Sequence, residues 1–264
     1  MNHSPFSNPL KFFKLERGNS SFIAYNRLDK KNKNLPEVLF LGGFHSDMTG
    51  TKATFLESIC EKREQTYTRF DYFGHGSSSG SFAEGTIGQW LCDALAIIDE
   101  VTKGPLILVG SSMGGWLMTL AARARPERVH ALIGIASAPD FTEELIWASL
   151  NESHRKDFIR QGMIQTPSQY EAQGFLITLQ LIEEGREHLV LPKAIDIHCP
   201  VHLIHGEVDK DVPWRLSSRL AQRIKSPDVT LTLIKNGNHR LNSPLALGRL
   251  ASILNEVSVL ETIN

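Results

Sequence analysis

The sequence predicts an α/β fold with a doubly wound, mostly parallel sheet. Short apolar runs alternate with segments of helical periodicity along most of the 264 residues. Continuous apolar runs of four to eight residues are typical of strands buried on both faces, as in a parallel sheet. Segment 140–195 interrupts this alternation, because it contains no convincing strand. Together these observations predict one large α/β domain with an insertion.

The predicted strands share a compact run rich in apolar residues: 37–44, 67–73, 104–110, 129–137, 200–206 and 228–235. The predicted helices share apolar residues spaced three or four apart: 52–63, 86–101, 114–127, 214–225 and 245–257. Each of these helices follows a predicted strand or its loop, which is the order of repeated βα units.

Within the insertion, residues 141–151 and 167–185 have helical patterns joined by irregular connections. An insertion between parallel strands lies over their carboxyl ends, where ligands bind in open α/β sheets. We therefore predict a core of residues 1–139 and 196–264, with a small helical cap at 140–195. A longer crossover that packs away from the ligand site is the alternative.

The composition limits the classes of partner and compartment. Lys and Arg total 28 against 29 Asp and Glu, for a net charge of -1, so nucleic acid and anionic lipid are not expected partners. Cys60, Cys92 and Cys199 are odd in number and form no C-x-x-C pair, which predicts neither a disulfide framework nor a zinc site. No secretory signal or membrane-spanning run is recognised. These observations predict a cytoplasmic protein without metal or cofactor.

Two segments match G-x-S-x-G, and they centre on Ser78 and Ser112. A nucleophilic serine of this motif needs a strand before it and a helix directly after it. Residues 106–109 supply the strand before Ser112, and the predicted helix begins directly after it. Ser78 is followed by further turns, so we expect it in a loop that borders the same pocket. Ser111, one position early, is expected to point elsewhere.

A serine nucleophile needs a base and an orienting acid, which follow in the chain order Ser, Asp or Glu, His. The loop after strand 200–206 contains Asp209, with Glu207 and Asp211 as rivals. His239 lies in the loop after strand 228–235, downstream of all three acids. Histidine suits this role because its pKa lies near working pH.

An oxyanion hole needs two backbone N–H groups aimed at the developing negative charge. The residue after the nucleophile supplies one, which predicts the N–H of Met113. The loop after an early strand supplies the other, and the glycines before Phe44 allow the tight turn that this requires. We therefore predict Phe44 as the second donor.

The chain resembles the α/β-hydrolase superfamily over nearly its whole length. The resemblance rests on "LFLGGFHSDMTGTKA", "TRFDYFGHGSSSG", "ILVGSSMGGWLM", "HGEVDKDVPW" and "NHR". The segments "FDYFGHGSS", "ARPERVHALIGIA" and "MIQTPSQYEAQGF" further resemble the mitochondrial palmitoyl-protein thioesterases of animals, also described as acyl-glucuronide esterases. This resemblance implies the α/β-hydrolase fold and hydrolysis of acyl esters or thioesters by Ser112, Asp209 and His239. The shorter chain without a clear transit peptide favours a bacterial cytoplasmic relative.

Two alternatives to ester or thioester hydrolysis stay open. A peptidase or amidase would use the same three residues and would be expected to place acidic residues in the cap, for which the candidates are Glu143, Glu144, Glu183 and Glu184. An ester or thioester hydrolase acting on a small-molecule or acylated substrate would line its pocket with apolar side chains, for which the candidates are Trp116, Trp147, Phe175, Leu176 and Leu179. A non-catalytic ligand-binding member of the fold is the remaining alternative.

Overall fold

The computed structural model describes residues 12–18, 20–30, 34–166 and 174–259. Eight strands form the main sheet: β1 (Phe13–Glu16), β2 (Phe22–Leu28), β3 (Glu37–Leu41), β4 (Tyr67–Phe70), β5 (Leu106–Ser111), β6 (Val129–Ile135), β9 (Val201–Gly206) and β10 (Val229–Ile234). Their order across the sheet is β1-β2-β4-β3-β5-β6-β9-β10. The first two pairings, β1 with β2 and β2 with β4, are antiparallel, and all the others are parallel. The predicted mostly parallel sheet is confirmed.

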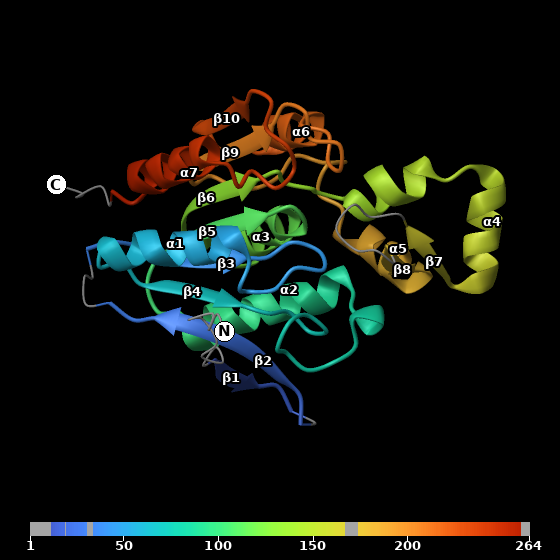
Figure 1. Cartoon of the computed structure of the whole chain (residues 1–264), viewed down its shortest axis with the longest axis horizontal. Coiled ribbons are helices and arrows are strands. Elements are labelled where there is room, and N and C mark those ends of the chain that lie inside the picture. The colour runs from blue at the N-terminus through green and yellow to red at the C-terminus, as the bar shows by residue number, and fades with distance from the viewer. Residues whose placement is uncertain (1–11, 19, 31–33, 167–173, 260–264) are drawn as a thin grey trace, which may run out of the picture.

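Helices cover both faces of the sheet (Figure 1). Around the main sheet the structure contains α1 (Thr51–Lys62), η1 (Phe82–Glu84), α2 (Ile87–Ala96), η2 (Ile97–Val101), α3 (Met113–Ala124), η3 (Pro126–Arg128), α6 (Arg215–Arg223) and α7 (Pro244–Val257). Apolar residues of α1 and α7 pack on one face, and those of α2, α3 and α6 pack on the other. None of the helices in the described ranges is long and apolar enough to span a membrane.

The antiparallel edge was not predicted. Strands β1 and β2 precede the first predicted strand and form a hairpin in which Phe13 pairs with Tyr25. Most of β1 is exposed, so it lacks the continuous apolar run that marks the interior strands. In β2, the residues Phe22 to Tyr25 do form such a run, and this was the available signal.

The insertion projects from one end of the core (Figure 1). It contains η4 (Thr142–Ile146), η5 (Trp147–Ser149), α4 (Glu152–Gln161), β7 (Met163–Thr166), β8 (Phe175–Thr178), α5 (Leu179–Gly185) and η6 (Arg186–His188). The prediction of no strand there is wrong, because β7 and β8 pair antiparallel. The helix predicted at 167–185 is found only from Leu179 onward, and its first seven residues lie outside the described ranges. Four-residue apolar strands cannot be told from helical turns by periodicity alone.

The two ends of the insertion are joined by one buried carboxylate. Asp140 accepts hydrogen bonds from the backbone N–H groups of Val190 and Leu191, at 2.9 and 2.8 Å. The side chain is 1% exposed, and Asp140 has a φ of 55°, which costs energy for a residue with a side chain. This contact holds the beginning of the insertion next to its end, 50 residues later.

The sheet and α3 approach so closely that two positions have no room for a side chain. A Cβ on Gly114 would overlap the carbonyl oxygens of Leu41 and Gly42, and a Cβ on Gly110 would overlap Gly114. The packing therefore requires glycine two residues before and two residues after Ser112. The neighbouring atoms are backbone, so they cannot move aside as the end of a flexible side chain can.

We expect Gly114→Ala to lower the free energy of unfolding by about 1–3 kcal/mol, because the new methyl group overpacks against backbone of β3 and its loop. The measurement is urea unfolding monitored by circular dichroism. Gly248→Ala is the matched control, since Gly248 lies within α7 and its Cβ would meet no atom within 4 Å. It should stabilise the protein by about 0.5–1 kcal/mol. Equal effects of the two substitutions would contradict the close approach.

The burial of Asp140 predicts that the free energy of unfolding depends on pH. Burial raises the pKa of the Asp140 carboxyl from 3.8 to about 6, although the N–H groups of Val190 and Leu191 oppose the shift. Between these two values the folded chain retains a proton that the unfolded chain has released, so rising pH lowers the free energy of unfolding. Urea unfolding at pH 4.5 and 6.5 should show this loss in the wild type. Asp140→Asn should reduce the slope by up to about one proton, and an unchanged slope would contradict the assignment.

Candidate active site

Ser112 lies at the turn between β5 and α3. Its φ of 55° and ψ of -118° differ from those of both elements, and its N–H donates to the carbonyl of Ile135 at 2.9 Å. Its own carbonyl accepts from the N–H groups of Gly115 and Ala138. A strained turn between a strand and a helix lifts a serine hydroxyl above the end of the sheet. Ser112 therefore projects at the carboxyl end of the central parallel strands.

His239 and Asp209 come from the loops after β10 and β9. These strands run parallel to β5, with β6 between β5 and β9, so all their carboxyl ends lie at the same end of the sheet. His239 Nε2 lies 3.1 Å from Ser112 Oγ, and His239 Nδ1 lies 2.7 Å from Asp209 Oδ2. The Asp209 side chain is fully buried, whereas that of His239 is 16% exposed. The structure thus brings the three sequence-predicted residues into one continuous chain of hydrogen bonds.

Both carboxylate oxygens of Asp209 are engaged by neighbouring groups. Asp209 Oδ1 accepts from the N–H groups of Asp211 and Val212, both at 2.9 Å, and Oδ2 contacts His239 and His205. Burial alone would raise the pKa of Asp209, but the hydrogen bonds from His205, His239 and the backbone and the nearby His239 together hold it well below its ordinary value. Asp209 is therefore a carboxylate at neutral pH.

The two rival acids differ in placement, and Asp211 has a carboxylate oxygen within 4.8 Å of a ring nitrogen of His239. Asp211 lines the cavity and donates its own N–H to Asp209. Glu207 is exposed, and its Oε2 accepts from the N–H of Asn236 at 3.2 Å. In the structure the carboxylate that meets His239 Nδ1 is that of Asp209.

Two backbone segments, the start of α3 and the loop before Phe44, lie beside Ser112. Met113 is the first residue of α3, so its N–H has no acceptor within the helix and lies at the positive end of the helix dipole. The loop before Phe44 passes so close to Ser112 that a Cβ on Gly43 would lie 3.3 Å from the Ser112 Cβ. The Phe44 ring packs edge-on against Phe141 and Phe175, and this packing fixes the loop that carries the Phe44 N–H.

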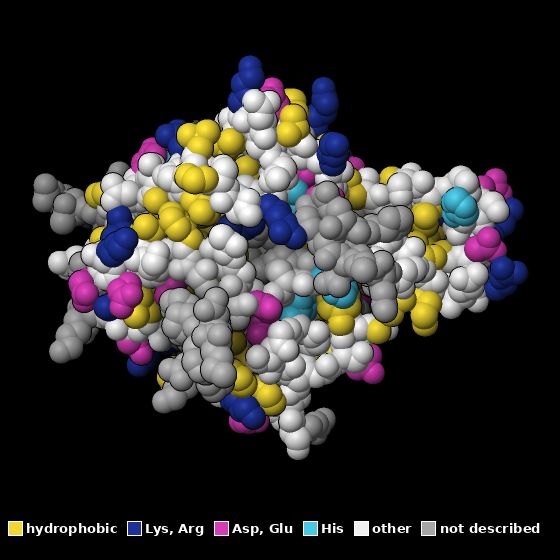
Figure 2. Space-filling view, in the orientation of Figure 1, with side chains coloured by type: hydrophobic (Ala, Val, Ile, Leu, Met, Phe, Trp, Pro, Cys, Tyr) yellow, Lys and Arg dark blue, Asp and Glu magenta, His cyan; other side chains and the backbone are white. Residues whose placement is uncertain are grey.

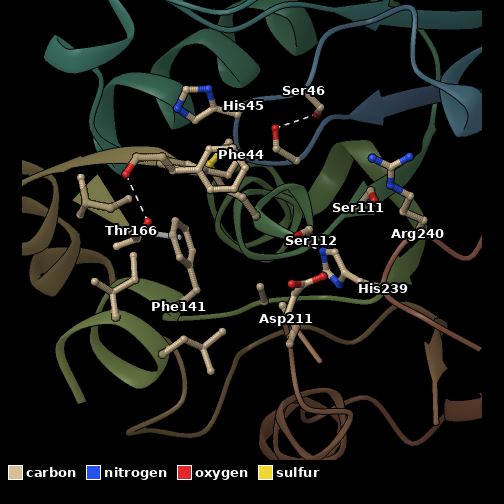
Figure 3. A pocket seen from close by; sticks show the side chains of 18 of the residues that line it. Phe44, His45, Ser46, Ser111, Ser112, Phe141, Thr166, Asp211, His239 and Arg240 are labelled. Carbon is tan, nitrogen blue, oxygen red and sulfur yellow. Dashed lines mark hydrogen bonds between the residues drawn. The ribbon is translucent and has the colours of Figure 1, made fainter. Parts of the chain in front are cut away.

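A cavity of about 1060 Å³ opens in front of Ser112, between the core and the insertion. Figure 3 shows Ser112 and His239 on one side of it and the rings of Phe44 and Phe141 on another. Figure 2 shows histidine and apolar side chains gathered where the core meets the insertion. The apolar residues that line the cavity include Phe40, Phe44, Met113, Phe141, Leu145, Ile146, Leu150, Ile164, Phe175, Ile177 and Val212.

Of the three aromatic residues predicted to contact substrate, only Phe175 lines this cavity. Trp116 is fully buried in the core behind Phe141, and its indole N–H donates to the carbonyl of His188. Trp147 packs on Phe158, with the guanidinium groups of Arg155 and Arg186 over its ring. The structure thus corrects the expectation for both tryptophans, because their rings stabilise packing of the core and of the insertion.

Ser78, the other G-x-S-x-G serine, forms hydrogen bonds that hold its loop in place. Ser78 Oγ donates to the carbonyl of Asp71 and accepts from the N–H of Ala24. Ser78 therefore ties the glycine-rich loop to β2 and to the end of β4 and does not border the cavity, contrary to the expectation. Ser111 does lie in the cavity wall, although it was expected to point away, but His239 contacts Ser112.

Three of the four candidate glutamates of the insertion have partners away from the cavity. Glu143 pairs with Arg186 at 2.8 Å, and Glu144 forms two hydrogen bonds with Arg219. Glu184 accepts from the N–H of Gly88 and contacts His188. None of these carboxylates lines the cavity.

Sequence reasoning missed Lys52, a half-buried residue in the first turn of α1 that lines the cavity. Its Nζ donates to the carbonyl of Arg240 at 2.7 Å, which links α1 to the loop that carries His239. Burial and the charge of Arg240 lower the pKa of Lys52 to about 8, while Asp209 partly opposes the shift. A helical lysine gives no local signal of such a contact, because the two residues are 188 positions apart.

One group of possible metal ligands occurs among the described residues. Atoms of Asp209, Asp211 and His239 lie within 4.8 Å of one another. The 2.7 Å contact between His239 Nδ1 and Asp209 Oδ2 has the geometry of a charge-assisted hydrogen bond. Asp209 and His239 therefore belong to the hydrogen-bonded path that leads from Ser112.

Comparison with known proteins identifies the class of the chain. The model of the alpha/beta hydrolase family matches residues 38–247, so the chain belongs to the α/β-hydrolase family. The predicted fold and the prediction of a hydrolase enzyme are both confirmed.

Individual relatives are similar over most of their length. The mitochondrial palmitoyl-protein thioesterase ABHD10 of Mus musculus is 45% identical over 228 residues, which cover 86% of this chain and 75% of that protein. A solved structure of alpha/beta hydrolase domain-containing protein 10 from mouse superposes with a TM-score of 0.87 at 40% identity, covering 94% of this chain and 98% of that one. A putative hydrolase from Agrobacterium vitis superposes with a TM-score of 0.90 at 35% identity, covering 95% and 100%.

The expected cytoplasmic location is contradicted. The animal relatives are named as mitochondrial proteins, which points to mitochondria rather than to the cytoplasm. Unpaired cysteines exclude only an oxidising compartment, and they do not separate the cytoplasm from another reducing compartment.

Ser78→Ala should lower the free energy of unfolding by about 1–2 kcal/mol, because it leaves the buried carbonyl of Asp71 and the N–H of Ala24 without their partner. Turnover by folded protein should stay within about twofold of wild type, since Ser78 does not touch the cavity. Urea unfolding and steady-state kinetics on the same preparation check both statements. A large loss of kcat at unchanged stability would assign chemistry to the glycine-rich loop.

Proposed function

We propose that the protein hydrolyses acyl thioesters or esters with Ser112 as nucleophile, His239 as base and Asp209 as orienting acid. The observation that carries the proposal is the unbroken path from Ser112 Oγ through His239 to Asp209, with contacts of 3.1 and 2.7 Å. A non-catalytic ligand-binding protein would have no need for a complete path of this kind.

The path sets the direction of proton transfer. Ionised Asp209 accepts a hydrogen bond from the N–H at His239 Nδ1, which leaves the Nε2 lone pair facing the Ser112 hydroxyl. As Ser112 Oγ attacks the acyl carbon, its proton moves to Nε2, and the buried carboxylate stabilises the resulting imidazolium. The imidazolium then gives this proton to the departing thiolate or alkoxide. A water repeats the sequence on the acyl-enzyme and releases the acid.

Developing negative charge on the carbonyl oxygen needs donors that are already in place. The N–H of Met113 lies at the start of α3, and the loop at Gly43 and Phe44 passes against Ser112. Both are backbone groups held by packing, so they need no reorganisation as charge develops. We assign the oxyanion hole to Met113 and Phe44.

We further propose that residues 140–195 form a cap over this site. Its residues Leu145, Ile146 and Ile164 face the cavity together with Phe141. An apolar enclosure of this size suits an acyl chain, because burial of each methylene contributes about 0.8 kcal/mol. Relatives are named palmitoyl-protein thioesterases, which supports an acylated substrate for this chain as well.

The peptidase alternative finds less support. Recognition of a free amino terminus needs unpaired carboxylates in the cap, but Glu143 and Glu144 are held by arginines and Glu184 by Gly88 and His188. Asp157 of α4 does line the cavity, and it is paired with Arg160 at 2.7 Å. The apolar lining near Ser112 favours an acyl chain over a charged amine.

A fluorophosphonate probe tests the nucleophile. We expect one label per chain, mapped by mass spectrometry to the peptide that contains Ser112, because only an activated serine attacks the phosphorus. Ser112→Ala should abolish labelling and lower kcat by about 10⁴-fold or more, whereas Ser111→Ala should retain labelling. Label on another serine, or turnover by folded Ser112→Ala, would refute the proposal.

The same preparation tests the substrate class. Activity on acyl thioesters and p-nitrophenyl acyl esters should exceed that on aminoacyl anilides, and kcat/KM should rise with acyl length until the cavity is filled. A preference for anilides would favour the peptidase alternative.

A further inference from the structure

A second histidine contacts the carboxylate that holds His239. His205 is the fifth residue of β9, and its side chain is fully buried. Its Nε2 lies 3.1 Å from Asp209 Oδ2 and 2.9 Å from the carbonyl oxygen of Val212. Its Nδ1 lies 2.7 Å from the hydroxyl of Ser217, a fully buried residue of α6. Oδ2 of Asp209 therefore lies between two imidazole rings, of which only that of His239 reaches the cavity.

The contacts of His205 define which of its nitrogens carries a hydrogen. The carbonyl of Val212 can only accept, so Nε2 must be the donor. In a neutral ring Nδ1 then accepts from the Ser217 hydroxyl, and in a charged ring it donates to that hydroxyl. In both states an N–H faces Asp209 Oδ2.

On this geometry, and resting on the proposed function, we infer that His205 is a positioning residue of the active site. Its Nε2–H holds Asp209 Oδ2 at the one orientation that also meets His239 Nδ1, and it shares that oxygen's negative charge with His239. Ser217 and Val212 keep the ring in place.

Two consequences follow from the shared oxygen. Without the His205 donor, the orientation of the carboxylate depends on the N–H groups of Asp211 and Val212 at its other oxygen, so its contact with His239 Nδ1 is held less precisely. The remaining charge on Oδ2 would also act on His239 alone and stabilise its protonated form more strongly. Loss of the donor should therefore lower kcat and move the acidic limb of the rate profile to higher pH.

Other charged groups near Asp209 could also affect that profile. They are Lys52 from α1, Arg240 from the loop of His239, and Asp211 from the loop of Asp209. All three side chains reach the cavity wall, whereas His205 is buried behind Asp209. Substitution of His205 leaves these groups in place, so their effect on the pH profile is the same in the wild type and in the His205 variants.

Two amide substitutions separate the contacts of His205. His205→Asn places its amide near the position of Nδ1, so it retains a partner for Ser217 and loses the donor to Asp209. His205→Gln reaches the position of Nε2 and retains that donor. His202→Asn is the control outside the site, because His202 is a buried residue of the same strand that contacts Thr230.

We expect His205→Asn to lower kcat about tenfold with little change in KM, and to shift the acidic limb of kcat/KM upward by about 0.5–1 pH unit. His205→Gln should recover most of both effects, and His202→Asn should show neither. A merely structural role would reduce the amount of folded enzyme without moving the limb. An unmoved limb in folded His205→Asn, or an equal shift in His202→Asn, would overturn the inference.

A measurement on the unmodified protein decides the question if His205→Asn does not fold. Nitrogen-15 NMR of histidine-labelled wild type should show a hydrogen on Nε2 of His205, and this signal should move when Ser112 is phosphonylated. A bare Nε2, or a signal unaffected by phosphonylation, would overturn the inference. Failure of the probe to label Ser112 would instead refute the proposed function, so the two failures are distinguishable.

Discussion

The close approach of backbone to backbone at Ser112 is the constraint on which the site depends. Gly110 and Gly114 leave no room for a Cβ, so β5 and α3 meet the end of β3 at van der Waals distance. This contact forces the strained turn at Ser112 and sets Met113 beside the loop of Phe44. The proposed nucleophile and both proposed oxyanion donors are thus placed by packing of the main chain, independently of the loops that carry Asp209 and His239.

Those loops are organised around one buried negative charge. A carboxylate removed from water needs a full set of donors, and Asp209 obtains them from two backbone N–H groups and two imidazoles. The same bonds keep its pKa low and orient it, so the electrostatic and the geometric requirements of the site are met by one set of contacts. Lys52 adds a tether from α1 to the neighbouring residue of the His239 loop.

The sequence predicts what depends on local pattern and chain order. The strand, turn and helix around Ser112 are contiguous, and the acid and base follow in the order that the fold requires, so all could be found without coordinates. Tertiary distinctions could not. Trp116 and Phe175 are both large and apolar, and only packing decides that one lies in the core and the other at the cavity. The pair β7 and β8 is too short for a periodic signal. His205 has the sequence setting of an ordinary strand residue, and only the folded structure places it beside Asp209.

The bond from Asp140 to Val190 and Leu191 bears on how this hydrolase can diversify. It brings the two ends of the insertion together, so the core spans the same short distance whatever lies between them. The entropic cost of closing the inserted segment into a loop grows only slowly with its length. The insertion can therefore lengthen, shorten or change composition to suit another acyl group, while Ser112, Asp209 and His239 keep their positions in the core.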